Sequence, residues 1–205
     1  MEFWNSLLTE KSWKIMQGLR KEGFRFIVIG GWAAYLWTKQ HKSRGIDIII
    51  PDFKSLEVLK KKYDLRKNDN LKKYEIKIDE IDVDIYIPYY SRTTLPIQEL
   101  INETTNVEGF EVIKPEILLI LKQGAEFDRK DSIKGQKDRI DIMTLLCYVE
   151  INFKKYKDIL IKYKLEKYKQ RLKEIINSFR DLKHLNLNII DYIKIKKRLV
   201  RDLDW

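Results

Sequence analysis

The chain has 205 residues, of which 44% are hydrophobic and 12% aromatic, and its formal net charge is +10. This length and composition predict a folded core, as one domain or one domain with a helical appendage, and they exclude a disordered chain. The single cysteine, Cys147, excludes an internal disulfide framework and fits a reducing compartment, where we expect it to pack in the core. No apolar run approaches the ~18 residues of a membrane helix, and the N-terminus lacks a signal-peptide layout. We therefore expect a cytoplasmic protein without a membrane span, and the enrichment in Lys, Ile and Glu is typical of a thermophile.

The predicted elements begin with a helix that Asn5 or Ser6 caps and Gly23 ends. The elements that follow are strands at 25–29 and 46–50 around a helix at 32–39, a helix from Asp52 to Tyr63, a turn at 68–70, strands at 72–78 and 81–87, a short helix at 96–101, a strand at 110–113, a helix at 115–127, a charged loop at 128–135, and helices beyond it. This order predicts an α/β (α+β) fold in which helices flank a mixed β-sheet.

The positive charge is concentrated near the C-terminal end. Residues 151–201 hold 16 Lys and Arg against 5 Asp and Glu, whereas the rest of the chain is close to neutral. A basic helical portion is typical of nucleic-acid contact. Solvated, Lys-rich helix faces explain the same charge, and both interpretations stay open. We accordingly expect a domain at 1–149 and a basic helical region at 150–205.

Two glycines, Gly30 and Gly31, stand between the first buried strand and the helix after it. Glycine has no Cβ, so the backbone there can turn tightly and bring its N–H groups close to an anion. The positive end of the helix dipole points at the same glycine turn, so a phosphate group is the anion that we expect to bind there. An ordinary turn is the alternative. No lysine of the Walker type follows the pair, which excludes a P-loop.

Three acids occupy strands that are otherwise apolar. Asp47 lies among isoleucines in a strand suited to burial on both faces, where a carboxylate usually binds a metal, pairs with a cation or does chemistry. Asp82 and Asp84 alternate with apolar residues, so both point to one face of their strand. Two like charges on one face repel each other unless a cation lies between them, which favours a site over a solvated strand face.

These residues together resemble the nucleotidyltransferase fold shared with DNA polymerase β. The resemblance covers residues 24–145 and depends on the glycine pair, on Lys42-Ser43 and on the acidic strand after them. It is closest to small archaeal and bacterial members, which include toxin and antitoxin relatives. The resemblance implies Mg²⁺ or Mn²⁺ as cofactor and a nucleoside triphosphate as substrate. It also implies that Asp47 and either Asp82 or Asp84, with a slight preference for Asp84, are catalytic and metal-binding.

One position departs from the family pattern, which is Asp-hydrophobic-Asp. The chain has Gly45 where the first carboxylate is expected, and moving the alignment by two residues would place Ile49 at the second acidic position. Two magnesium ions usually need bridging carboxylates, so this loss should cripple transfer. The sequence therefore predicts an inactivated or variant form.

The resemblance also implies a set of nucleotide-binding residues: Gly30, Gly31, Ser43, Lys122, Lys137, Arg129 and Asp138. Lys122 lies in an apolar run, where snorkelling is the alternative to phosphate binding. Lys137, Asp138 and Asp141 share one helical turn, and a surface ion pair explains them nearly as well as a family segment that braces the lysine. Arg129 and Lys137 are the second-rank phosphate contacts.

The expected function is nucleotidyl transfer to a hydroxyl of RNA or protein in an intact form, with weak or absent activity in this chain. The acceptor stays open among tRNA, a protein hydroxyl and a small antibiotic-like molecule. The competing hypothesis is a non-enzymatic, antitoxin-like or nucleic-acid-binding module that acts through the basic C-terminal helices. Its partners would be tRNA or other RNA, or a toxin or antitoxin protein. No Cys/His or Ser/His/Asp arrangement indicates zinc or acyl-transfer chemistry.

Overall fold

The structure, a computed structural model, describes residues 7–205, so the cap expected at Asn5 or Ser6 lies outside the described residues. The chain forms two compact units, one ending at Lys114 and the other spanning Pro115–Trp205. The limit expected at residue 149 falls inside the second unit, just after a helix ends at Tyr148.

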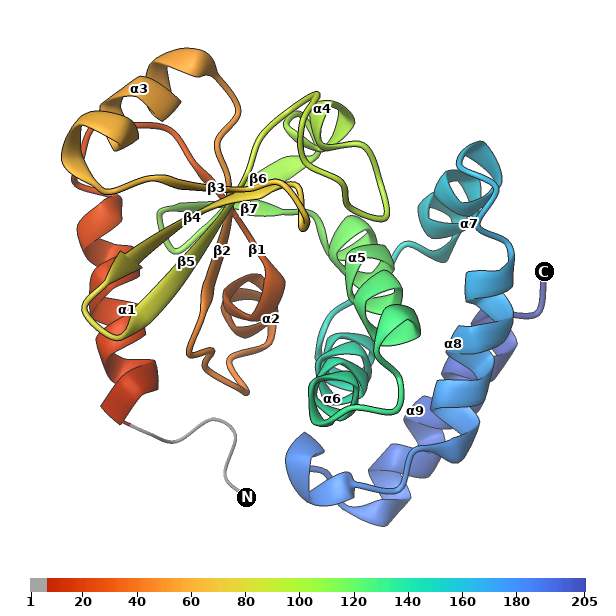
Figure 1. Cartoon of the computed structure of the whole chain (residues 1–205). Helices are drawn as coiled ribbons and strands as arrows, with labels where there is room; N and C mark the ends of the chain where they lie inside the picture. Colours follow the sequence, from red (N-terminus) through yellow and green to blue (C-terminus); the bar gives the residue numbers. More distant parts are fainter. Residues whose placement is uncertain (1–6) are drawn as a thin grey trace. The chain divides into compact units, whose positions relative to one another are not determined.

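The first unit is built on a seven-stranded sheet with the order β3-β4-β5-β2-β1-β7-β6 (Figure 1). Its elements are α1 (Leu7–Leu19), β1 (Ile27–Ile29), α2 (Gly30–Thr38), β2 (Ile46–Ile49), α3 (Phe53–Lys62), β3 (Arg66–Asn68), β4 (Lys73–Ile78), β5 (Ile81–Tyr86), α4 (Ile97–Leu100), β6 (Thr104–Val107) and β7 (Phe110–Ile113). β2 runs parallel to β5 and antiparallel to β1, and β1 runs parallel to β7. The predicted mixed sheet with flanking helices is confirmed.

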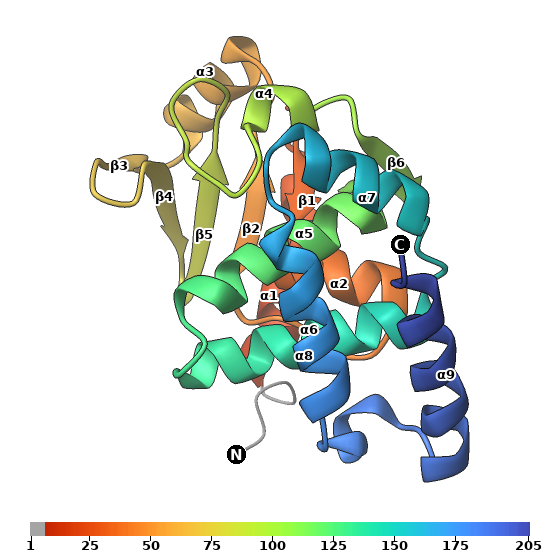
Figure 2. The ribbon, with the colours of Figure 1, turned by 90° about the vertical axis from the view of Figure 1, so that its right-hand side faces the viewer.

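The core of the first unit explains the position of α2. Trp32 of α2 is fully buried, and its indole N–H donates a 2.9 Å hydrogen bond to Ser12 of α1. The ring of Trp13 packs on Trp32 with 5.1 Å between centroids. Asp52 caps α3, because its side chain accepts a 2.8 Å hydrogen bond from the backbone N–H of Ser55. Figure 2 shows α3 and α4 beyond the carboxyl ends of β2 and β5.

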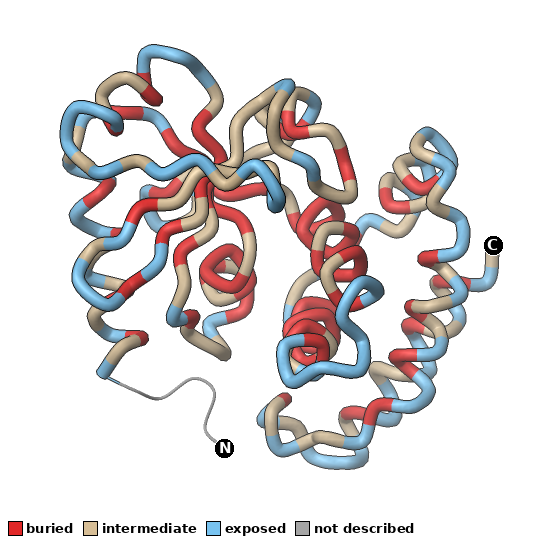
Figure 3. Tube along the Cα trace, viewed as in Figure 1, coloured by how far each residue is buried: buried red, intermediate tan, exposed pale blue. Residues whose placement is uncertain are grey.

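The second unit is helical. Its elements are α5 (Pro115–Asp128), α6 (Ile133–Tyr148), α7 (Phe153–Lys162), α8 (Lys167–Ser178), a 3₁₀ turn at Leu182–Leu185 and α9 (Ile189–Asp202). In its interior Gln123 accepts a 2.8 Å hydrogen bond from the Tyr156 hydroxyl and donates one of equal length to the carbonyl of Tyr168. The carboxylate of Glu126 is fully buried and accepts hydrogen bonds of 2.9 Å from both Arg139 and Arg171. Figure 3 shows buried residues most continuously along α5 and α6 in this unit.

Two strands were not predicted, and two helices, α2 and α6, begin earlier than predicted. The edge strands β3 and β6 were not predicted, because Arg66-Lys-Asn68 and Thr104-Thr-Asn-Val107 lack an alternation of apolar and polar residues. The charged loop expected at 128–135 ends earlier, because Ser132 caps α6 by accepting a hydrogen bond from the N–H of Gly135. Among residues 7–205, none of the helices combines the length and hydropathy that a membrane crossing needs.

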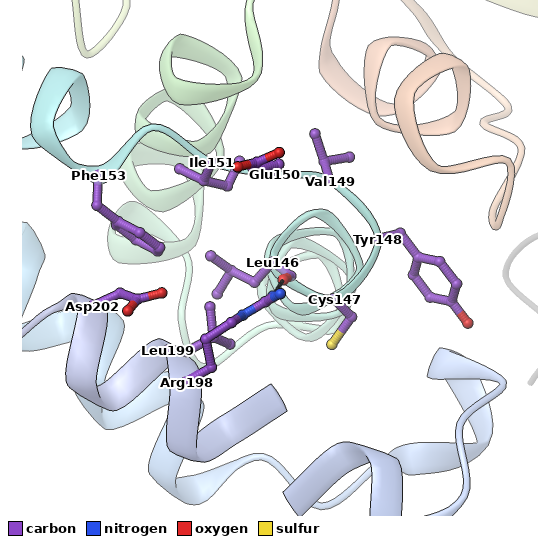
Figure 4. Close-up of a pocket in the computed structure, with 10 residues that line it drawn as sticks. All are labelled: Leu146, Cys147, Tyr148, Val149, Glu150, Ile151, Phe153, Arg198, Leu199 and Asp202. Carbon is purple, nitrogen blue, oxygen red and sulfur yellow. Dashed lines mark hydrogen bonds between the residues drawn. The ribbon is translucent and has the colours of Figure 1, made fainter. Parts of the chain in front are cut away.

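A cavity of about 300 Å³ lies within the second unit, between the end of α6, the start of α7 and α9 (Figure 4). The guanidinium of Arg198 reaches across it and donates a 3.3 Å hydrogen bond to the carbonyl of Leu146. Cys147 is half-buried at the same cavity, and burial raises the pKa of its thiol to about 12. This cavity contains none of the residues that the sequence predicts as functional.

The raised pKa predicts that the thiol of Cys147 reacts slowly. Only the thiolate reacts with disulfide reagents, so at pH 8 we expect folded Cys147 to react about 1,000-fold more slowly than a thiol of ordinary pKa. The measurement is colour release from an aromatic disulfide reagent, followed with and without urea. A fast reaction in the folded protein would contradict the burial of this side chain.

Candidate functional site

Strands β2 and β5 bring the predicted carboxylates together. Asp47 pairs directly with Asp84 in the parallel register of these strands, and paired residues of parallel strands have side chains on the same face. Asp82 lies two residues before Asp84 and so shares that face. Asp47 and Asp84 are half-buried, whereas Asp82 is exposed. We call this surface of β2 and β5, defined by Asp47, Asp82 and Asp84, the acidic face.

The glycine turn lies against the first of these acids. Gly30 has a φ of +65°, in the left-handed region, and begins α2. A Cβ at Gly30 would lie 2.8 Å from Cγ of Asp47 and in collision with its Oδ2. Only glycine therefore allows this approach of backbone to carboxylate. Gly31 is buried in the first turn of α2, and Ser43 is buried in the connection to β2.

Gly45 opens the acidic face on the side of Asp82. A Cβ at Gly45 would meet only the backbone oxygen of Asp82, at 3.9 Å. A Cβ at position 45 would thus displace no neighbour. Within residues 7–205, no three His, Cys, Asp or Glu side chains gather closely enough to hold a metal ion.

A lysine that the sequence patterns did not reveal sits on the acidic face. Lys73 Nζ of β4 lies 2.6 Å from Oδ2 of Asp84 and 3.1 Å from Oε1 of Glu75. Partial burial lowers the pKa of Lys73, but hydrogen bonds and charge from Asp84 and Glu75 raise it by more, so its pKa lies above the ordinary value. The available signal was the hairpin turn at 79–80, because it sets the β4–β5 register that places Glu75 opposite Asp84.

Lys73 competes with any other cation for Asp84. We expect Lys73→Met to bind Mg²⁺ or Mn²⁺ about tenfold more tightly, since it removes a positive charge in contact with that carboxylate. The measurement is the metal-dependent rise of the melting temperature without nucleotide. Lys77→Met is the matched control, because Lys77 lies on the same face of β4 but is opposite Asp82, not Asp84, in the strand register. Equal metal affinity of both variants and the parent would show that Lys73 does not compete.

The predicted nucleotide-binding residues of the C-terminal half lie in the second unit, where three of them, Lys122, Arg129 and Asp138, form a charge cluster with Asp141. Lys122 is buried in α5, with its Nζ 2.6 Å from Asp141 and 3.5 Å from Asp138 of α6. Nε of Arg129 lies 2.7 Å from Oδ2 of Asp138. Lys137 is half-buried on α6. This pairing gives Lys122 a structural reason for its charge, and a role of these residues in nucleotide binding stays a prediction.

Sequence comparison finds no relative: neither a protein-family model nor a curated protein matches the chain. Comparison of structures finds similar folds. A candidate nucleotidyltransferase from H. pylori matches with a TM-score of 0.53 and 17% identity, over 96% of this chain and 98% of that one. ANT(2")-Ia, solved in complex with adenylyl-2"-tobramycin, matches with a TM-score of 0.52 and 12% identity, over 79% and 99%. The chain therefore has a fold similar to those of these two structures, in agreement with the nucleotidyltransferase-like fold that its sequence predicts.

Proposed function

We propose that the first unit binds a nucleoside triphosphate with Mg²⁺ or Mn²⁺ at the acidic face, and that nucleotidyl transfer by this chain is weak or absent. The observation that carries the proposal is the convergence of three groups. Asp47 and Asp84 are in register on neighbouring strands, and the Gly30 turn touches Asp47 where α2 begins. Carboxylates beside a helix N-terminus suit a metal ion and the phosphates that it accompanies.

The carboxylates present fit one magnesium ion. Mg²⁺ is commonly held by one or two carboxylates, while water and substrate phosphates fill its other positions. Asp47 and Asp84 would hold it, and the bound ion would supply positive charge against the triphosphate. A second ion does not fit, because the carboxylate that would help to bridge two ions is replaced by Gly45.

Other groups of the chain would orient the phosphates and the acceptor. Backbone N–H groups at the start of α2 would orient the phosphates, and the buried Ser43 would line the turn. An acceptor hydroxyl would have to approach the α-phosphate in line. The adenylyl-2"-tobramycin bound to ANT(2")-Ia, whose fold is similar, supports this class of reaction.

The test is binding of labelled nucleoside triphosphates with Mg²⁺ and with EDTA. We expect Mg²⁺ to strengthen binding, and Asp47→Asn to remove most of that gain, about tenfold or more in affinity. Asp64→Asn serves as the control, because this side chain is 79% exposed and lies in the same unit. Nucleotide binding that is identical in Mg²⁺ and EDTA would exclude the proposal.

The basic C-terminal helices support a second candidate function. Lys194, Lys197 and Arg201 are exposed along one face of α9 at helical spacing. A non-enzymatic module would use such a face for tRNA or other RNA, or for an acidic toxin or antitoxin partner. RNA affinity should then fall steeply with salt, and replacing all three residues by Gln should flatten that response. A salt response that is flat in the parent protein would remove this candidate.

A further inference from the structure

A tight turn follows β5 and presents an aromatic ring to solvent. The N–H of Ser91 donates a 3.1 Å hydrogen bond to the carbonyl of Ile87, and the N–H of Ile87 donates one of 3.0 Å to Oγ of Ser91. Between them Tyr89 is 90% exposed and has a φ of +61°, in the left-handed region. Packing does not require this ring, and the backbone conformation disfavours a bulky residue. We call residues 87–91 the Tyr89 turn.

The neighbouring tyrosine anchors this turn to the β3–β4 hairpin. The Tyr90 hydroxyl lies 3.2 Å from the carbonyl oxygen of Asn68 and 3.1 Å from Oδ1 of Asp69. The Tyr90 ring packs against Tyr74 of β4 with 5.4 Å between centroids. The Tyr89 ring is thus carried on a fixed support beside the hairpin.

Two lysines lie beside the ring of Tyr90, and one of them, Lys67, also pairs with Asp69 at 2.8 Å. Nζ of Lys67 lies 4.9 Å, and Nζ of Lys72 5.7 Å, from the centroid of Tyr90. Residues 66–73 contain four basic side chains and one acidic one, and Arg92 is exposed just beyond the turn. An exposed aromatic ring among lysines and arginines matches a ligand that alternates flat rings with negative charges.

We infer that the Tyr89 turn and the β3–β4 hairpin bind single-stranded nucleic acid. A base would stack on Tyr89, and Lys67 and Lys72 would contact the phosphates. The turn lies at the carboxyl end of β5, ~10 Å of extended strand beyond Asp84. A strand held here presents its terminal hydroxyl to the acidic face as the acceptor, and only this last step rests on the proposed function.

The test compares a single-stranded RNA of ~12 nucleotides with an abasic strand of equal charge, in EDTA and without nucleotide. For Tyr89→Ala we expect about tenfold weaker binding of the RNA, an unchanged affinity for the abasic strand, and an unchanged melting temperature. Tyr89→Phe keeps the ring and should bind as the parent does. Phe53→Ala is the matched control, because Phe53 is also an exposed ring, 72% accessible, with Lys60 over it.

A second pair of variants separates this surface from α9. Replacing Lys67 and Lys72 by Gln should weaken both strands alike and lower the salt slope by ~1.4. If only the α9 variants of Lys194, Lys197 and Arg201 weaken RNA binding, the inference is wrong. It is also wrong if Tyr89→Ala binds RNA as the parent does, or if an acidic peptide displaces RNA at equal charge.

The proposed function can fail independently. The RNA-binding test is run in EDTA and without nucleotide, so its outcome depends on neither metal binding nor nucleotide binding. RNA binding that depends on Tyr89, without any Mg²⁺-dependent nucleotide binding, would overturn the proposed function but would support the inference about the Tyr89 turn.

Discussion

Replacing Gly45 by Asp is expected to turn a weak or silent site into one that responds strongly to magnesium. The new carboxylate would stand on the acidic face, next to Asp82 and two residues from Asp47, with open space around its Cβ. Without metal we expect a loss of roughly 0.5–1 kcal/mol in the free energy of unfolding, from repulsion between like charges. With Mg²⁺ this loss should disappear, and nucleotide incorporation should rise at least ~100-fold.

The measurements are urea unfolding with and without Mg²⁺, and transfer of labelled nucleotide to bulk RNA and to the protein itself. Gly45→Asn is the matched control, because it adds a side chain of nearly the same shape without charge. Combining Gly45→Asp with Asp47→Asn should abolish the gain. If Gly45→Asp behaves like Gly45→Asn in every assay, the acidic face is a scaffold and the catalytic interpretation is wrong.

The central part of the fold was predictable because its signals are local. Buried strands rich in isoleucine, a glycine pair and the alternating acids of β5 each define an element from a few neighbouring residues. The juxtaposition of Asp47 with Asp84 needed one more step, the parallel register of β2 and β5, which no local pattern gives. The structure places these two residues directly opposite each other.

The cation beside Asp84 was not predictable from such local signals. In the sequence, Lys73 is one polar residue in a half-exposed strand. Its contact with Asp84 depends on which strand β4 pairs with and in what register. The edge strands β3 and β6 depend in the same way on pairing with a partner and not on their own composition. Lys122 is conspicuous in the sequence because a charge in an apolar run needs a partner or a function. The two carboxylates that pair with it come from another helix.

Gly30→Ala is expected to cost about 3 kcal/mol or more in the free energy of unfolding, the largest loss of stability predicted for this chain. An alanine at a φ of +65° pays a backbone cost of ~1–2 kcal/mol, and its Cβ would collide with the Asp47 carboxylate. That carboxylate must move, so Mg²⁺-dependent nucleotide binding should fall together with stability. The measurements are urea unfolding and nucleotide binding on the same preparation.

Gly23→Ala isolates the backbone contribution to the loss of stability. Gly23 has a similar φ of +78°, but a Cβ added there would meet no atom within 4 Å apart from those of its chain neighbours. We expect it to cost ~1 kcal/mol and to leave nucleotide binding intact. Asp47→Ala combined with Gly30→Ala should recover part of the lost stability, since the colliding Cγ and oxygen are gone while Cβ of residue 47 remains. Equal losses for Gly23→Ala and Gly30→Ala would mean that the glycine turn does not touch Asp47. The convergence on which the proposed function depends would then be absent.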